Sequence, residues 1–346
     1  MKRLLILTTA LAGFTLQAQA AELTVMSWGG AYGGAQTEAH VKPWAGKSGF
    51  AAKMVDSDNP AQPVKAQVEA GNVTIDVASL EYADAIRLCD EGVLEKIDIN
   101  ALPAGADGTP AKDDFLPGAV TDCGVSTDIW ANVYGYDTTK LTGTVPTTAA
   151  DFYDLAKFPG KRGLRKGAKG NLEFALLADG VAPADVYKTL STKEGVDRAF
   201  KKLDQIKKHI NVWWTGGAQT TQLLQSGEVD MCQTWNARAQ TVTDAGGPVR
   251  INWNQGLYSI EGWGIAKGNP KAAAGKRFAA YTANAKRQAA FTELLAYGPT
   301  NPNAYKFIPA ATAAKLPTAP AIFPTIILAK EEWWAANRQK GEERFT

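Results

Sequence analysis

The sequence predicts an α/β fold whose sheets are doubly wound and mixed. Short apolar strands alternate with helices along the chain, an order that favours strands in a sheet with helices on both faces. The 346 residues suggest about two domains, at roughly 150 residues for each. An apolar content of 45% with 21% charged residues is typical of a globular protein, which excludes a disordered or multi-span membrane chain.

Residues 1–20 predict a secretory signal peptide rather than a part of the fold. A positive start at residues 1–3 precedes an apolar run at 4–16, and Ala-Gln-Ala at 18–20 is a cleavage site of small residues. The run is too short for the roughly 20 residues that a transmembrane helix needs. We expect an exported periplasmic protein that begins near Ala21.

The charge balance excludes one class of partner. The formal net charge is +2, and without Lys2 and Arg3 the 37 basic residues become 35, equal to the 35 acidic residues. A nucleic-acid-binding protein would carry a basic surface, so we expect no nucleic-acid partner.

The chain also lacks the motifs of common enzymes and metal proteins. It has only two histidines, and no zinc, nucleophile-elbow or phosphate-loop motif occurs. We therefore expect no cofactor, no metal site and no enzymatic activity.

The first part of the mature chain alternates strand and helix. Val73, Ile75 and Val77 alternate with polar residues, as in a strand. Gly71 and Gly92 each follow a segment with helical spacing, and a glycine at this position is typical of the end of a helix. The expected strands are 23–26, 50–55 and 73–77, and the expected helices are 33–44, 64–71 and 82–91.

The rest of the chain continues in the same way. Val196, Ala199 and Leu203 recur at helical spacing with lysines on the opposite face. The expected helices are 151–157, 196–206, 217–225, 271–285, 287–296 and 330–338, and the expected strands are 212–214 and 229–233.

The expected mature chain contains three cysteines, and disulfides are stable in exported proteins. Cys89 follows a helical pattern, and Cys123 sits in a turn. Cys232 lies in an apolar run, where a thiol behaves as a small hydrophobic group. We expect a Cys89–Cys123 disulfide and a free, buried Cys232.

Five segments form a pattern in a fixed order. They are Ser-Trp-Gly-Gly-Ala-Tyr at 27–32, Asp-Val-Ala-Ser-Leu-Glu-Tyr at 76–82, Trp-Asn-Ala-Arg at 235–238, Tyr-Ser-Ile-Glu-Gly-Trp at 258–263 and Tyr-Gly-Pro-Thr-Asn-Pro at 297–302. Together they resemble the periplasmic solute-binding proteins of ABC transporters, in the spermidine/putrescine-binding group with its γ-aminobutyrate-binding relatives. The resemblance covers nearly the whole mature chain.

The resemblance implies a two-lobed, type II-like fold that closes around a ligand by a hinge motion. It also implies an ABC permease of the inner membrane as partner, and we expect a monomer. The expected boundaries are 22–128 and 262–299 for lobe one and 129–261 and 300–346 for lobe two, with crossings near Ile129-Trp130 and Glu261-Gly262. A return of the C-terminal tail to lobe one is left open.

The pocket candidates follow strands, where open α/β sheets bind their ligands. Trp28 follows the first strand, Ser79 follows the third, and Trp235 follows the strand near Met231. The expected ligand-binding residues are Trp28, Gly30, Ala31, Tyr32, Ser79, Leu80, Glu81, Trp235, Arg238, Glu261 and Trp263.

Two charged candidates decide the expected class of ligand. Glu261 matches the acidic residue that the resemblance places in the crossing strand, where it would pair with an ammonium. Arg238 lies 23 residues before it, an arrangement that resembles γ-aminobutyrate-binding members. A guanidinium forms two parallel hydrogen bonds with a carboxylate. The leading hypothesis is therefore a small amine-containing solute, with an ω-amino acid zwitterion favoured.

A polyamine is the first alternative. It requires a second acidic group in the cleft, which Asp56, Asp58 or Glu173 would have to supply. A hydrolase of another class would use Glu261 with a second carboxylate, either Glu81 or Asp128.

An anionic ligand is the remaining alternative. The backbone N–H groups of the turn at 29–31 would bind it together with Arg238. Ferric iron held by Tyr297 and Tyr305 is a variant of this reading, weakened by the scarcity of histidine.

Overall fold

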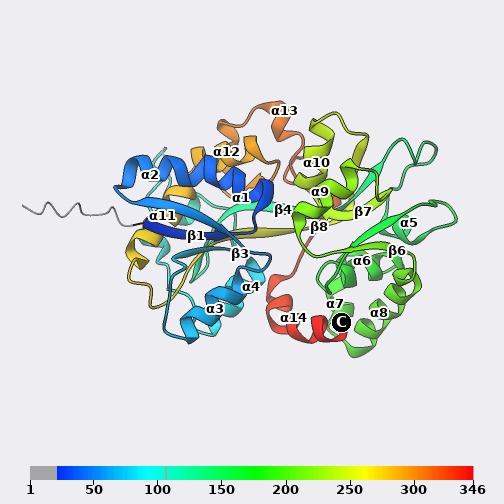
Figure 1. The fold of residues 1–346 in the computed structure, drawn as a ribbon, viewed down its shortest axis with the longest axis horizontal. Helices are drawn as coiled ribbons and strands as arrows, with labels where there is room; N and C mark the ends of the chain where they lie inside the picture. The colour runs from blue at the N-terminus through cyan, green and yellow to red at the C-terminus, as the bar shows by residue number, and fades with distance from the viewer. Residues whose placement is uncertain (1–21, 106, 346) are drawn as a thin grey trace, which may run out of the picture.

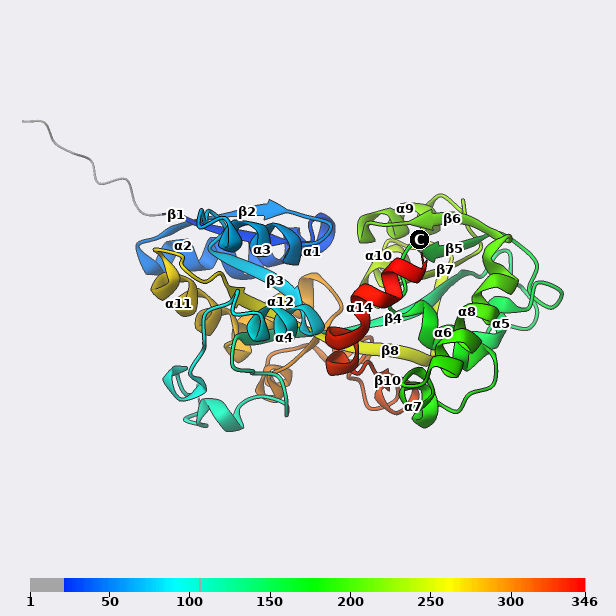
Figure 2. The same cartoon turned by 90° about the horizontal axis from the view of Figure 1, so that it is seen from below.

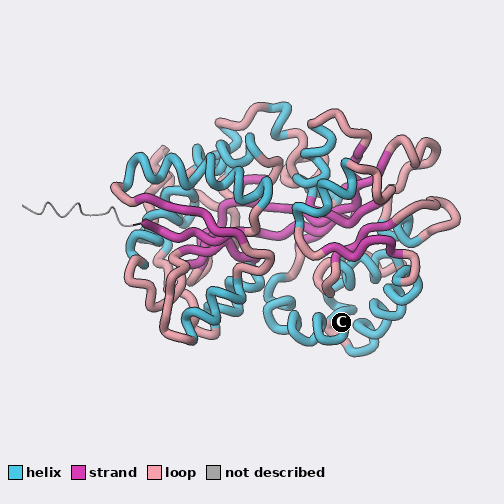
Figure 3. The backbone as a smooth tube through the Cα atoms, in the orientation of Figure 1, coloured by secondary structure: helices cyan, strands magenta, loops and turns pink. Residues whose placement is uncertain are grey.

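One mixed sheet of ten strands runs through the described part of the molecule (Figure 3). The structure is a computed structural model that describes residues 22–105 and 107–345. The expected signal peptide therefore lies outside the described residues. The main path of the sheet is β2-β1-β3-β8-β4-β7-β5-β6, with β9 on β4 and β10 on β8. The strands are β1 (Glu22–Ser27), β2 (Ala51–Asp56), β3 (Val77–Glu81), β4 (Gly124–Asp137), β5 (Arg162–Arg165), β6 (Ile210–Trp214), β7 (Met231–Trp235), β8 (Val249–Ile265), β9 (Gly298–Pro299) and β10 (Ile327–Leu328).

Two long antiparallel strands join the two halves of the molecule. β4 has 14 residues and β8 has 17, and they pair with each other along most of their length. Figure 2 shows β4 and β8 crossing from one half to the other. We call the half with β1–β3 the first lobe and the half with β5–β7 the second lobe. The expected two-lobed α/β fold with a mixed sheet is confirmed.

Helices cover the sheet in both lobes (Figure 1). In the first lobe, α1 and α2 are joined by a π-helical segment at 37–41, so that the chain is helical from 30 to 48. The helices of the first lobe are α1 (Gly30–Gln36), α2 (Lys42–Ser48), α3 (Ala61–Glu69), α4 (Tyr82–Asp90), α11 (Ala272–Thr282) and α12 (Ala285–Leu294). Those of the second lobe are α5 (Ala149–Tyr153), α6 (Asn171–Ala178), α7 (Val186–Leu190), α8 (Lys193–Lys207), α9 (Gly217–Gln225) and α10 (Asn236–Asp244).

The C-terminal segment contacts both lobes. Ala304, Ile308 and Leu316 pack against α12 of the first lobe, around the short helix α13 (Ala310–Ala313). The last helix, α14 (Glu331–Phe345), buries Trp334 in the core of the second lobe and packs beside α4 of the first. The segment 302–316 thus lies on the first lobe, whereas the sequence analysis assigned 300–346 to the second.

The main errors of the sequence analysis concern buried strands. The strand expected at 73–77 is β3 at Val77–Glu81, and all five of its residues are buried. The whole of β4 is buried as well. A strand that is covered on both faces shows no alternation of apolar and polar residues, which removes the signal that sequence analysis uses. β5 and α6 were also missed, because β5 is only four residues long and the basic, glycine-containing stretch that joins it to α6 reads as a loop.

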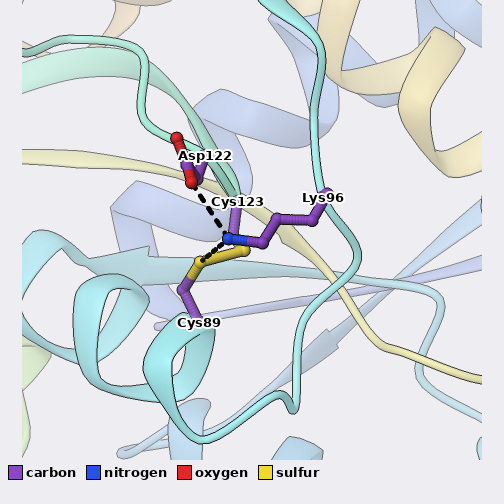
Figure 4. Close-up of a disulfide and its surroundings, with 4 residues drawn as sticks. All are labelled: Cys89, Lys96, Asp122 and Cys123. Carbon is purple, nitrogen blue, oxygen red and sulfur yellow. Dashed lines mark hydrogen bonds and ion pairs between the residues drawn. A yellow bond between two sulfur atoms is a disulfide. The ribbon is translucent and has the colours of Figure 1, made fainter.

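The predicted disulfide is confirmed, and it links a helix of the first lobe to the residue before β4. Cys89 of α4 is bonded to Cys123, which directly precedes β4. Lys96 lies beside this bond (Figure 4). Its ammonium nitrogen is 3.0 Å from a carboxylate oxygen of Asp122 and 3.6 Å from the Cys89 sulfur. Cys232 is buried and free, as expected. The disulfide ties α4 to the start of the first crossing strand.

Removing the disulfide should destabilise the protein. The bond joins residues 34 apart in the sequence, and closing a loop of this length stabilises by about 3–4 kcal/mol through the unfolded chain. We expect the double variant Cys89→Ser/Cys123→Ser to lose free energy of unfolding by this amount in urea denaturation. Adding a reductant should shift the wild-type curve to match the variant and leave the variant unchanged. A reductant effect of equal size on both proteins would contradict this account.

Candidate ligand-binding site

A pocket lies between the lobes, at the point where the crossing strands pass from one to the other. The space between its walls, together with its open mouth, amounts to about 500 Å³. Both lobes supply its walls. The lining residues are Trp28, Tyr32, Asp58, Glu81, Trp130, Arg165, Thr215, Gly216, Gly217, Trp235, Arg238, Glu261 and Tyr297.

Three acidic residues lie side by side at this junction. Glu81 of β3 is the direct cross-strand partner of Glu261 of β8, and Glu261 is the partner of Asp128 of β4. Directly opposed residues in a sheet have Cβ atoms roughly 5 Å apart. The exposed fractions of these three side chains are only 2%, 3% and 0%. Because buried carboxylates of like charge repel each other, each one needs a compensating group.

Glu81 is compensated by the protein itself. Its Oε2 accepts a hydrogen bond of 3.2 Å from Lys169 and pairs with Arg338 at 3.1 Å, while its Oε1 is 3.8 Å from Arg165. Burial alone would raise the pKa of Glu81, but the charges of Lys169, Arg338 and Arg165 outweigh it and lower the pKa below its usual range. Glu81 is therefore an ionised and fully paired carboxylate.

Glu261 and Asp128 receive neutral donors instead. The indole N–H of Trp28 and the hydroxyl of Ser79 donate to Glu261, at 2.7 and 3.0 Å. The hydroxyl of Tyr32 donates to Asp128 at 2.9 Å. Among the described residues, no cation forms an ion pair with either carboxyl group.

The lack of a cation changes the charge state of these two acids. Burial raises the pKa of Asp128 to about 7. Burial, with the neighbouring charges of Asp128 and Glu81, raises the pKa of Glu261 well above its usual range. A cation placed beside them would favour the ionised forms, so this end of the pocket is suited to an ammonium group.

Arg238 lies in the first turn of α10, directly after β7, where the change from strand to helix turns its side chain into the pocket. Only 4% of it is exposed, and its Nε is buried without a hydrogen-bond partner. Within the described part of the chain, Arg238 forms no ion pair. A buried guanidinium without an anion is costly, so this end of the pocket is suited to an anionic group.

The two lobes touch at the mouth of the pocket. A Cβ added to Gly30 of the first lobe would lie 3.1 Å from Cβ of Ala218 in the second lobe and 3.6 Å from a terminal nitrogen of Arg238. A Cβ added to Gly216 would lie 3.1 Å from Oδ1 of Asp58. These contacts indicate that the lobes are closed over the pocket.

Aromatic rings form much of the remaining wall. The rings of Trp130 and Trp235 meet edge to face at 6.3 Å, and Tyr32 and Tyr297 lie 5.8 Å apart. Rings of this kind exclude water and attract ammonium groups and methylene chains.

The predicted site residues fall into three groups. Trp28, Tyr32, Glu81, Trp235, Arg238 and Glu261 line the pocket. Ser79 lies behind it and orients Glu261, while Gly30 and Ala31 are exposed at the start of α1, beside the mouth.

Leu80 and Trp263 do not lie at the pocket. Leu80 points to the opposite face of β3 from Ser79 and Glu81, into a core cluster. Trp263 is two residues beyond Glu261 along β8, which carries it into the first lobe, against His40 and Phe278.

Several pocket residues were missed or given another role. Asp128 lies behind the lining residue Tyr32, whose hydroxyl donates to it, and was considered only as a hydrolytic partner of Glu261. Tyr297 lines the pocket and was considered as part of the segment 297–302 and as an iron ligand. Trp130 was noted only as a crossing point, although an aromatic residue in a crossing strand is a usable signal. Arg165 lies in a basic stretch at 165–171 and was not among the expected ligand-binding residues.

Two kinds of feature are absent from the described ranges. No group of three or more metal-ligating side chains within 22–105 and 107–345 is arranged to hold a metal ion. No helix in these ranges is long and apolar enough to cross a membrane.

Asp128 should make the stability of the ligand-free protein depend on pH. Its pKa in the folded state is about 7, above the ordinary value of 3.8, so its contribution is greatest below about pH 4 and is lost as pH rises to about 7. We expect the free energy of unfolding in urea to fall over this range, and Asp128→Asn to reduce the fall by about 4 kcal/mol. The exposed Asp90 supplies the control, since Asp90→Asn should leave the profile unchanged. Equal profiles for wild type and Asp128→Asn would contradict the assignment.

Comparison with known proteins agrees with this architecture. Residues 41–323 match the family described as bacterial extracellular solute-binding protein. The γ-aminobutyric acid-binding protein of Pseudomonas aeruginosa is 41% identical over 329 residues, which cover 95% of this chain and 91% of that protein.

Solved structures lead to the same family. The protein MotA from A. tumefaciens B6, in complex with glucopine, is 32% identical with a TM-score of 0.87, over 94% of this chain and 98% of that one. The Atu4243 GABA receptor is 32% identical with a TM-score of 0.82, over 94% and 96%. Two lobes, one junction pocket and these similarities lead to one conclusion: the chain belongs to the family of bacterial extracellular solute-binding proteins.

Proposed function

We propose that this protein captures an ω-amino acid of the γ-aminobutyrate type for import by an ABC transporter. The observation that carries the proposal is that one pocket has two ionisable groups without an ion pair: the carboxyl group of Glu261, with that of Asp128 behind it, and the guanidinium of Arg238. An ω-amino acid carries an ammonium and a carboxylate separated by methylene groups, so it supplies the missing charge at both ends. The name of the relative from Pseudomonas aeruginosa agrees with this ligand class.

In this proposal the ammonium binds beside Glu261 and Asp128. Ser79 and Trp28 hold the Glu261 carboxylate in position through their hydrogen bonds. The approach of a cation lowers the pKa of both acids, so they ionise and release protons as the ligand binds.

The carboxylate binds to Arg238 through the planar guanidinium, which suits two parallel hydrogen bonds. The rings of Trp28, Tyr32 and Trp235 enclose the methylene chain. Binding would therefore pair every buried charge that the pocket leaves unpaired.

A hinge in the crossing strands is part of the same proposal. β4 and β8 connect the lobes, and the expected crossings near Ile129-Trp130 and Glu261-Gly262 lie within them. We place the lobe boundaries there, with 302–316 added to the first lobe. The closed, liganded monomer would be presented to a membrane permease, and a signal peptide at 1–20 would direct export to the periplasm.

The alternatives receive less support from the site. A diamine needs a second free acid, but Glu81 is already paired with three cations. Of the acids proposed for that role, Asp58 lines the pocket but is exposed, and Glu173 is buried with Tyr187 and Trp334. Hydrolysis is disfavoured because the family binds and delivers solutes.

Truncation of Arg238 should weaken binding of the zwitterion strongly. Removing one partner of a buried charge pair costs about 2–5 kcal/mol, so we expect Arg238→Met to reduce the affinity for γ-aminobutyrate by about 30-fold or more. Isothermal titration calorimetry on protein that has been unfolded and refolded, to remove any carried ligand, measures this directly.

The exposed Arg250 provides a matched control, because Arg250→Met removes the same charge far from the pocket. Its affinity for γ-aminobutyrate should equal that of the wild type. Wild-type protein that binds no ω-amino acid, or Arg238→Met that binds γ-aminobutyrate as well as the wild type does, would refute the proposed function.

A further inference from the structure

We propose that Arg165 determines the charge specificity of the pocket, because it occupies the one oxygen of Glu81 that would otherwise bind a second ligand ammonium. This inference rests on the proposed function and deepens it. The junction holds three acids in a row, yet by this assignment only two of them are available to a ligand. Arg165 is thus a specificity-determining residue that acts through Glu81.

The position of Arg165 supports this role. It is the last residue of β5, and both Arg165 and Glu81 line the pocket, from the second and the first lobe respectively. Its guanidinium carbon lies 5.0 Å from the centre of the Trp235 ring, and one of its nitrogens is 3.8 Å from Oε1 of Glu81. The indole ring holds the guanidinium over the acid as the lobes meet.

The two oxygens of Glu81 are not equivalent. Oε2 is held by Lys169 and Arg338, which also pair with Glu331 and Asp84 deeper in the junction. For Oε1, the cation within ion-pairing distance is Arg165. Removing Arg165 would therefore expose one carboxylate oxygen to the pocket and leave the rest of the cluster in place.

The charge around Oε1 of Glu81 supports the same role. Asp84 is paired with Arg87 and Arg338, and Glu331 is paired with Lys169, so these neighbouring acids have their own cations. Without Arg165, Oε1 of Glu81 would face the pocket with no cation of the described residues within ion-pairing distance, and the second ammonium of a diamine would supply one. With Arg165 present, that ammonium meets a neutralised acid and a like charge, which is a repulsive element against the wrong ligand.

The test compares γ-aminobutyrate and 1,4-diaminobutane, which both have four carbon atoms but differ in whether the second charged group is a carboxylate or an ammonium. Their dissociation constants are measured by calorimetry for wild type, Arg165→Met and Arg165→Lys. We expect Arg165→Met to shift the affinity ratio toward the diamine by at least about tenfold, since removing a like charge favours the diamine ammonium. Arg165→Lys keeps the positive charge and should retain a ratio close to that of the wild type.

A second mutation tests whether Glu81 mediates the change. In the double variant Arg165→Met/Glu81→Gln the gain in diamine affinity should disappear, because the exposed acid is gone. Circular dichroism and thermal unfolding establish that each variant is folded. If Arg165→Met does not fold, Arg165→Gln takes its place in the test.

The outcomes separate this inference from the proposed function. An unchanged ratio in folded Arg165→Met, or a diamine gain that survives Glu81→Gln, overturns the role of Arg165. Wild-type protein that already binds the diamine as tightly as γ-aminobutyrate overturns it too. If the wild type binds no ω-amino acid, the proposed function fails, while a diamine gain in Arg165→Met that Glu81→Gln removes still supports the masking of Glu81.

Discussion

The cost of burying unpaired charge governs the junction between the lobes. Three neighbouring strands place Glu81, Glu261 and Asp128 in one row, away from water. Such a row is stable only when protons or cations neutralise it. The protein neutralises Glu81 with its own cations. Glu261 and Asp128 have no such cations, and protonation neutralises them in the absence of a ligand. The class of ligand that the pocket suits follows from the acids that have no cation partner, Glu261 and Asp128, together with Arg238.

The fold supplies these charges from segments far apart in the sequence. Glu81 comes from the first lobe, Arg165 and Lys169 from the second, and Arg338 from α14 at the end of the chain. The same ion cluster therefore balances the junction and fastens the C-terminal helix to it. Arg165 and Glu81 come from different lobes, so in this proposal the masking of Glu81 depends on lobe closure. A pocket of this kind selects for the number of ligand charges as well as for ligand size.

Sequence analysis could predict the features that depend on local spacing. The two-lobed α/β fold and the disulfide were expected, and Glu261, Arg238 and Trp235 do lie at one pocket. It could not place Trp263, because nothing in the local pattern tells how far β8 has entered the first lobe. It listed Glu81 as a simple ligand contact, since its neutralisation depends on three cations at least 84 residues away in the chain. The buried strands β3 and β4 lacked the alternation that marks a strand.

The most direct test of the account is a crystal structure of the protein with γ-aminobutyrate bound. The account predicts that the ligand nitrogen contacts Glu261, that the ligand carboxylate contacts Arg238, and that Glu81 remains paired with Arg165, Lys169 and Arg338. A ligand nitrogen on Glu81, or a carboxylate directed away from Arg238, would contradict it.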